Sequence, residues 1–197
     1  MYSKHLQNLI DQFTTLPGIG PKTAERLALF LASKPKAKIE EFTNSLEDLK
    51  NLKVCQLCHK FSDTNPCSIC ADSNRDKTTL CVVSSIQDLE TIESTKKFNG
   101  LYHILGGLID PISGITPDKL YIRELLNRVK TKNTKEIIIA FDANIQGEAT
   151  TNYIKNILVN SAIKITRLAR GIPMGSDIEY TDGITLSSAL ENRREIK

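Results

Sequence analysis

The chain has no tryptophan, and only 6% of its 197 residues are aromatic. Proteins that read RNA on an open sheet stack several bases on aromatic side chains, so this composition argues against that class. Apolar runs are also short, and none approaches the roughly 18 residues that a membrane-spanning helix needs. The first residues, Met1 to His5, lack the basic and apolar blocks of a secretory signal. We therefore expect a soluble, cytoplasmic protein.

An excess of charge of either sign is missing as well. The chain has 26 basic and 23 acidic residues, which leaves a net charge of only +3. Any contact with nucleic acid must then come from a local basic patch and not from a uniformly basic surface. A chain of this length buries about 70% of its unfolded surface, which allows one sizeable core and a small additional module.

Cysteine is scarce too, but four of the five cysteines are regularly spaced. Cys55, Cys58, Cys67 and Cys70 form the pattern C-x2-C-x8-C-x2-C. Two such pairs can direct four thiolates at one tetrahedral Zn2+ and leave no position open for water or substrate, which is typical of a structural zinc site. We expect one zinc per chain. Metal binding, worth roughly 10 to 16 kcal/mol in zinc-finger peptides, would hold residues 54–77 together.

Three other interpretations of these cysteines stay open. The thiols could form disulfides or lie buried without a common ligand, and His59 could replace one thiolate. Cys81 lies inside an apolar run, so we interpret it as a small core residue. On the zinc hypothesis, loss of a ligand should destabilise residues 54–77 without affecting the rest of the fold.

The amino-terminal segment predicts a helical hairpin. Apolar residues recur at helical spacing and predict helices over residues 3–14, 21–33 and 36–51. Between the first two, Gly18 and Gly20 can take a positive φ without cost, and Pro21 suits the first position of the next helix.

This hairpin matches the turn of helix-hairpin-helix DNA-binding motifs. In such motifs the N–H groups of a glycine-rich turn, here Gly18 and Gly20, and of the following helix meet a phosphate. Lys22 and Arg26 lie four residues apart on one helix face, where each would neutralise a phosphate without reading bases. A plain helical hairpin with a solvated basic face is the alternative.

The second half of the chain predicts an α/β fold with a mostly parallel sheet. Residues 79–83 and 136–141 are nearly continuous apolar runs, which are typical of buried parallel strands. Helical patterns follow at about 89–98, 120–129 and 149–159, before a strand at 163–168. His103 lies in a further predicted strand, and we interpret it as a hydrogen-bonded structural histidine. The final helix, near 186–194, is short enough to need a partner.

Taken together, these motifs resemble the RecR family of bacterial recombination mediators over nearly the whole chain. The matching segments are the hairpin, the four cysteines and residues 101–107, 147–150, 167–173 and 177–182. The resemblance implies a helix-hairpin-helix region (1–53), a C4 zinc finger (54–77), a Toprim domain (78–170) and a carboxyl-terminal arm (171–197). It also implies a tetrameric ring that encircles DNA and acts with RecO and RecF to load recombinase on gapped DNA.

The Toprim region departs from the catalytic pattern. Toprim topoisomerases and primases bind Mg2+ with a Glu after the first strand and an Asp-x-Asp after a later one. Here the first strand ends in Ser84-Ser85, and the later motif is Asp142-Ala143-Asn144. Asp142 and Glu148 remain as a partner contact, a vestigial acidic site, or an ordinary turn residue and helix-terminal acid.

Asp110 follows a glycine pair and is expected to join the same acidic cluster. Because the acids are too few for a Mg2+ site, we expect binding without catalysis. Two alternatives stay open: an adaptor that contacts DNA only through RecO, and a Mg2+-dependent Toprim nuclease or topoisomerase.

Overall fold

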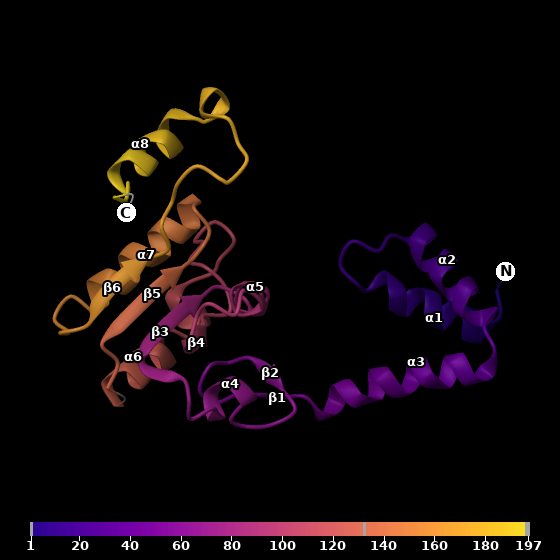
Figure 1. The fold of residues 1–197 in the computed structure, drawn as a ribbon. Helices are drawn as coiled ribbons and strands as arrows, with labels where there is room; N and C mark the ends of the chain where they lie inside the picture. Colours follow the sequence, from indigo (N-terminus) through magenta and orange to yellow (C-terminus); the bar gives the residue numbers. More distant parts are fainter. Residues whose placement is uncertain (1, 132, 196–197) are drawn as a thin grey trace. The chain divides into compact units, whose positions relative to one another are not determined.

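A computed structural model describes residues 2–131 and 133–195. The chain divides into two compact units, one that ends at Leu52 and one that begins at Lys53 (Figure 1). The first unit is entirely helical, and the second contains both β-sheets. No helix in the part of the chain that the structure describes is long and apolar enough to span a membrane.

The first unit is a pair of packed helices followed by a third. Helices α1 (Lys4–Thr14) and α2 (Pro21–Ala32) bury Ile10, Ala24 and Ala28 between them. Helix α3 (Lys36–Asp48) continues into the short 3-10 helix η1 (Leu49–Asn51) and buries no residue. The three helices predicted from apolar spacing are therefore confirmed.

The two turn glycines behave differently. Gly18 has φ +78°, the left-handed conformation that favours glycine. Gly20 has φ −81° and ψ 169°, so the expectation of a positive φ is wrong there. Gly20 instead serves as the extended N-cap residue of α2, with Pro21 as the first helical residue.

The second unit is built on a parallel sheet in the order β4-β3-β5-β6. The strands are β3 (Asp76–Val83), β4 (Gly100–Ile104), β5 (Glu136–Ala140) and β6 (Lys164–Arg167). Helix α5 (Ile86–Ser94) connects β3 to β4, α6 (Ile122–Thr131) precedes β5, and α7 (Ile145–Ile157) connects β5 to β6. Because the first crossover runs in the opposite direction along the sheet to the next two, right-handed connections place α5 on one face and α6 and α7 on the other.

The burial along β3 follows from this arrangement. Side chains alternate between the faces of a strand. Leu80 and Val82 join the core cluster that includes residues of α6 and α7, whereas Cys81 and Val83 join a second cluster with Leu89 of α5. Both faces of β3 are therefore covered, as the continuous apolar run predicts.

The cysteine module belongs to the second of these clusters. It consists of the antiparallel pair β1 (Lys53–Val54) and β2 (Phe61–Ser62) and the short helix α4 (Ser68–Ala71). Cys55, Cys58 and Cys67 share a hydrophobic cluster with Val83 and with Tyr102 of β4.

Hydrogen bonds also connect the module to the sheet. The Ile104 N–H donates to the Cys58 carbonyl over 2.9 Å. The buried Arg128 of α6 donates to the Leu57 carbonyl over 2.7 Å and to the Tyr102 carbonyl. The module and the sheet share side chains and hydrogen bonds, which argues against the expectation that a cysteine substitution spares the α/β core.

The carboxyl-terminal segment has little contact with the rest of the second unit. It contains the 3-10 helix η3 (Ile178–Tyr180) and helix α8 (Gly183–Glu191), neither of which buries a residue. Helix α8 begins three residues earlier than the predicted start, because the Asp182 side chain accepts from the N–H groups of Ile184 and Thr185 and caps it.

Candidate metal centre and nucleic-acid interface

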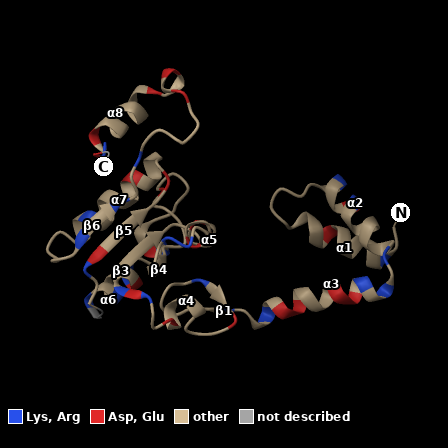
Figure 2. Ribbon diagram, viewed as in Figure 1, with Lys and Arg blue, Asp and Glu red and all other residues tan. Residues whose placement is uncertain are grey.

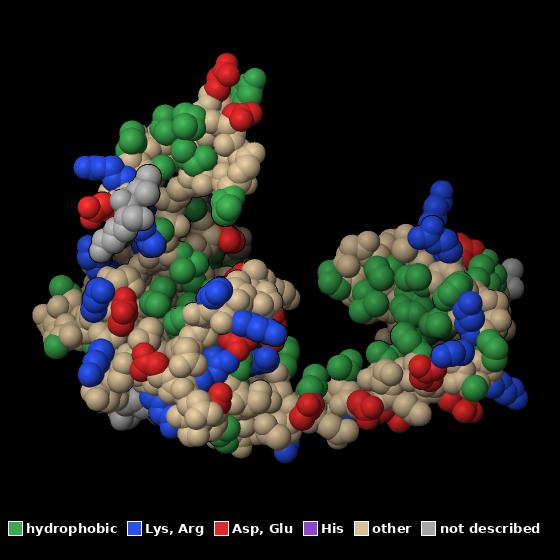
Figure 3. Space-filling view, viewed as in Figure 1, with side chains coloured by type: hydrophobic (Ala, Val, Ile, Leu, Met, Phe, Trp, Pro, Cys, Tyr) green, Lys and Arg blue, Asp and Glu red, His purple; other side chains and the backbone are tan. Residues whose placement is uncertain are grey.

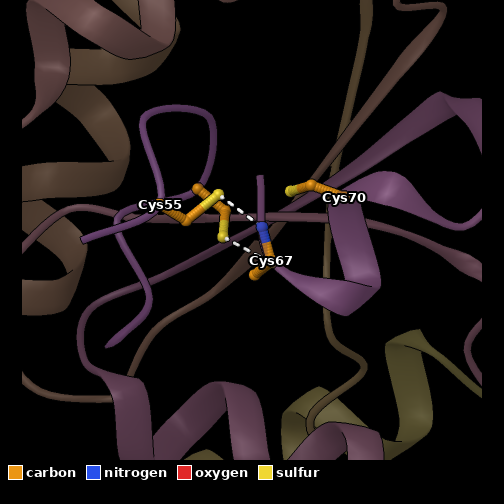
Figure 4. Close-up of side chains that lie close together, drawn as sticks. Cys55, Cys67 and Cys70 are labelled. Atoms are coloured by element: carbon orange, nitrogen blue, oxygen red, sulfur yellow. Dashed lines mark hydrogen bonds between the residues drawn. The ribbon is translucent and has the colours of Figure 1, made fainter. Parts of the chain in front are cut away.

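The four cysteines of the C-x2-C pairs converge on one point. Their Sγ atoms all lie within 4.8 Å of one another, and those of Cys58 and Cys67 are 3.5 Å apart. Four sulfurs bound about 2.3 Å from a tetrahedral Zn2+ lie about 3.8 Å apart, so the cluster has the size of a metal shell. Figure 4 shows Cys55 facing Cys67 and Cys70, which lie at the start of α4 and within it. These residues can hold a metal ion.

The surroundings of Cys55 favour a thiolate. Burial acts to raise its pKa, but backbone N–H groups, including that of Cys67 at 3.4 Å from Sγ, outweigh it and lower the pKa to about 6. The pKa of Cys58 is instead raised, because its side chain shares a hydrogen bond with Cys70 and is buried. Four neighbouring thiolates repel one another, and a divalent cation would remove that repulsion.

His59 is not part of the cluster, so the alternative in which it replaces a thiolate has no geometric support. It has φ +66° and stacks its ring on Tyr121, with the ring centroids 3.8 Å apart and the planes 5° from parallel. The module therefore contacts Tyr121, which directly precedes α6, through the His59 ring, in addition to providing the four sulfurs.

The hairpin between α1 and α2 presents an open helix terminus. The N-cap Gly20 has no side chain to accept from the first N–H groups of α2, which stay available to an anion. Lys22 and Arg26 are exposed on α2 and form no ion pair with a described residue. Figure 2 marks basic residues on α2 and residues of both charge signs along α3. This arrangement suits phosphate contacts made by the backbone and by two cations.

Glu148 is already paired. It lies in the first turn of α7 and contacts Arg167 at 3.4 Å and Arg170 at a shorter distance. The run before it is closely packed: a Cβ on Gly147 would lie 2.1 Å from the Asp142 carbonyl oxygen, so only glycine fits there. Sequence spacing does not reveal these two arginine partners, because they lie 19 and 22 residues away.

The other acids near the strand ends also have partners. Asp88 accepts from the Ser85 N–H at 2.9 Å and from the Ser84 hydroxyl, and forms a capping box at the start of α5. Asp110 accepts from the Ser113 hydroxyl at 2.8 Å, which lowers its pKa.

The expectation that Asp110 joins an acidic cluster is not met. The four cysteines are the sole group of three or more candidate metal ligands within residues 2–131 and 133–195. Ser84 and Ser85 serve the helix cap. Asp142 makes no side-chain hydrogen bond or ion pair with a described residue and stands alone as a carboxylate.

His103 and Cys81 have the structural roles that the sequence suggested. The Nε2 atom of His103 lies 2.8 Å from the Tyr121 carbonyl, and burial lowers the pKa of the imidazole to about 3. Cys81 is buried in β3, and burial raises its pKa to about 12. Neither residue is placed to act on a substrate.

Comparisons with known proteins agree with this architecture. Family models match residues 6–50 (RecR, helix-hairpin-helix), 78–169 (Toprim domain) and 171–194 (RecR, C-terminal). The recombination protein RecR of Bifidobacterium animalis subsp. lactis is 45% identical over 196 residues, which cover 99% of this chain and 98% of that protein. RecR of Bifidobacterium longum subsp. infantis is 44% identical over 195 residues, with 98% of each chain covered. The chain therefore belongs to the RecR family of recombination proteins, which gives it a role in recombination repair.

Proposed function

We propose that this protein is a zinc-stabilised DNA clamp that acts with RecO and RecF to load recombinase on gapped DNA, and that it catalyses no reaction itself. The observation that carries the proposal is the uncapped N-terminus of α2 beside the unpaired cations Lys22 and Arg26. DNA would be bound by phosphate contacts without regard to sequence. Gly18 and Gly20 would shape the turn that approaches the phosphate.

The metal is proposed to be one structural Zn2+ per chain, held by Cys55, Cys58, Cys67 and Cys70. Four thiolates suit this ion and leave no open coordination position. The chain's own residues would fix the site through the N–H donation from Cys67 to Cys55 and through packing on the sheet. Bound zinc would supply folding free energy and no reaction chemistry.

Absence of catalysis is supported by how the acids are used. Glu148 is neutralised by two arginines, Asp88 caps α5 and Asp110 holds its own turn. A Mg2+ site at the strand ends would have only Asp142 without a competing partner. Asp142 and Glu148 are instead proposed to contact a partner such as RecO, with Glu148 recognised together with its arginines.

Ring formation is supported by apolar surface at both ends of the chain. Figure 3 shows hydrophobic side chains gathered over α1, α2 and α3. Exposed apolar side chains of α2 and α3 include Leu29, Phe30, Phe42 and Leu46, and those of the carboxyl-terminal arm include Met174, Ile184 and Leu190. Two self-complementary patches per chain close a tetramer if the geometry permits. The proposed division into residues 1–53, 54–77, 78–170 and 171–197 is supported by the three family-model ranges.

The test is direct DNA binding by the purified protein. Fluorescence anisotropy with duplex DNA should show an affinity whose logarithm falls by about 0.9 per phosphate contact per decade of salt. The double variant Lys22→Ala/Arg26→Ala should lose most of the affinity and reduce the slope. The matched control, Lys36→Ala/Lys38→Ala on α3, removes the same charge from another helix and should bind nearly as the parent does.

The same samples separate the competing functions. With Mg2+ present, DNA recovered after deproteinisation should be unaltered; nicked or linear product would identify a Toprim enzyme, and Asp142→Asn would then be the first variant to examine. If the parent protein binds no DNA until RecO is added, the adaptor function replaces the clamp.

A further inference from the structure

The second unit contains a cavity that the proposed function does not use. It has a volume of 580 Å3 and lies where β3, β4 and β5 end. Its walls come from the chain after each strand and from the cysteine module, which contributes Val54, His59 and Phe61. Because the direction of winding reverses at this part of the sheet, the cavity lies at the crevice where open α/β sheets bind ligands.

Charged ligands find few partners in this cavity. Among the described residues no Lys or Arg lines it, and Asp110 is the one carboxylate. The Asp110 oxygens already accept from the Ser113 hydroxyl at 2.8 Å and from the Ile112 N–H at 3.1 Å. Neither Mg2+ nor a free phosphate is therefore matched by the lining.

The helix termini beside the cavity do not change this conclusion. The Ser85 hydroxyl caps α5 by accepting from the Asp88 N–H at 3.2 Å, and Asn144 caps α7 by accepting from the Gly147 N–H at 2.7 Å. Asp88 adds a negative charge at the first of these termini. An anion would meet capped N–H groups and a carboxylate.

The lining is well suited to a flat, uncharged group with polar edges. Phe61 is 56% exposed and offers aromatic surface, whereas one face of the Tyr121 ring is already covered by His59. Aliphatic side chains form much of the wall, and the uncharged amides of Gln87, Asn144 and Gln146 also line it. The volume falls within the range of roughly 300 to 1,000 Å3 of small-ligand pockets. A nucleobase has this combination of an apolar face and a hydrogen-bonding edge.

We propose that the cavity receives one unpaired base of single-stranded DNA, stacked against Phe61 with its edge toward the amides. The proposal rests on the proposed function, because the lining offers no cation for the phosphate and the strand must be held through its backbone elsewhere. It adds a preference for single-stranded over duplex DNA, since a paired base would first have to leave its pair and its stack.

The test compares single-strand binding by proteins with and without an aromatic ring at residue 61. A single-stranded oligonucleotide that contains 2-aminopurine reports stacking by fluorescence quenching, and a duplex of the same sequence is titrated in parallel. Phe61→Leu should weaken single-strand binding about tenfold and restore the fluorescence, because stacking of one base contributes that much. Phe61→Tyr, which retains the ring, should behave as the parent does, and the duplex affinity should not change.

Two controls keep the result interpretable. Tyr153 is 38% exposed and does not line the cavity. Tyr153→Leu therefore removes an aromatic ring from another part of the surface and should leave single-strand binding unchanged. Metal content and urea unfolding of Phe61→Leu should match the parent, so that a loss of binding is not a loss of fold.

The outcomes separate this proposal from the proposed function. If Phe61→Leu binds and quenches as the parent does while Lys22→Ala/Arg26→Ala loses both DNA forms, the clamp stands and the base site is refuted. Equal loss of duplex and single-strand binding in Phe61→Leu would also refute the base site, since a backbone contact would explain it. If the parent binds neither form, both proposals fail.

Discussion

The cysteine module and the carboxyl-terminal arm are both too small to form a core of their own. Within the described chain, only the cysteine module packs against the sheet. Cys55, Cys58 and Cys67 are buried beside β3 and β4, whereas α8 buries nothing and Ile184 is 85% exposed. Short segments gain order from what they pack against, because they bury too little apolar surface to offset their conformational entropy. The module packs on the sheet and brings four candidate metal ligands together, whereas we expect the arm to be ordered by another molecule.

The connections of the module explain why it cannot be treated as a separate finger. The carbonyl of Leu57 accepts from Arg128, and the carbonyl of Cys58 accepts from Ile104. The backbone between the first two ligands is therefore held by α6 and β4. No described side chain of α8 has a comparable buried contact with the sheet.

The largest effect should follow removal of the metal by a chelator or loss of a ligand in Cys55→Ser. Zinc binding worth roughly 10 kcal/mol or more is comparable to the whole stability of a domain, so the sheet should lose stability with the module. Hydrogen exchange should show faster exchange of amides in β3 and β4 as well as in residues 54–77. The control Cys81→Ala should keep one metal per chain. Unchanged protection of β3 and β4 in metal-free protein would mean that the module is independent after all.

This coupling also marks the limit of what the sequence predicted. The convergence of the four cysteines, the three amino-terminal helices and the parallel sheet follow from local spacing and were predicted correctly. Arg128 was not identified, because a basic residue in an amphipathic helix is usually solvated, and its carbonyl partners lie 26 and 71 residues away. Long-range hydrogen bonds leave no periodic signal in a single sequence.

The predicted start of helix α5 was also wrong, by three residues. The apolar pattern placed its start near Leu89, but the helix begins at Ile86 because Ser85 and Asp88 form a capping box. An Asp in the third helical position was the available signal. The ion pairs of Glu148 with Arg167 and Arg170, by contrast, join α7 to the chain in and beyond β6 and could not be read from spacing.

Arg128→Ala should produce the next largest effect. It removes two charge-assisted hydrogen bonds and leaves buried carbonyls without their donor, which should cost roughly 2 to 4 kcal/mol in the free energy of unfolding. Urea unfolding followed by circular dichroism measures the loss. Arg123→Ala removes an exposed arginine from the same helix and serves as the matched control, with little expected change. Equal stability of the two variants would show that the contact with the module contributes nothing.

Removal of the arm should change assembly more than folding. A chain that ends at Arg170 keeps the ion pairs of Glu148 and loses only residues that bury nothing within the described chain. Sedimentation should show a smaller assembly at micromolar concentration, while the sheet retains its metal and its protection from exchange. Ile184→Asp should also reduce the size of the assembly, because it places a charge on the apolar surface that is proposed to dock.

The contrary result would reverse the comparison. If the shortened chain sediments as the parent does but unfolds at a lower urea concentration, the arm packs on its own subunit. The arm and the cysteine module would then both be ordered by their own chain and would differ only in the elements that they contact.

The smallest effect compares the caps of two nine-residue helices, α5 and α8. Ser85→Ala removes a capping box at a helix that packs on the sheet, and should lower the free energy of unfolding by about 1 kcal/mol. Asp182→Ala removes two hydrogen bonds from N–H groups at a helix that buries no described residue. The free energy of unfolding of the sheet should therefore not change. The effect of the substitution should appear instead as weaker assembly in a sedimentation series over protein concentration, because the cap stabilises the helix that is proposed to dock. A stability loss of similar size in both variants would place α8 within the cooperative unit of the sheet, and the arm would then be ordered by its own chain.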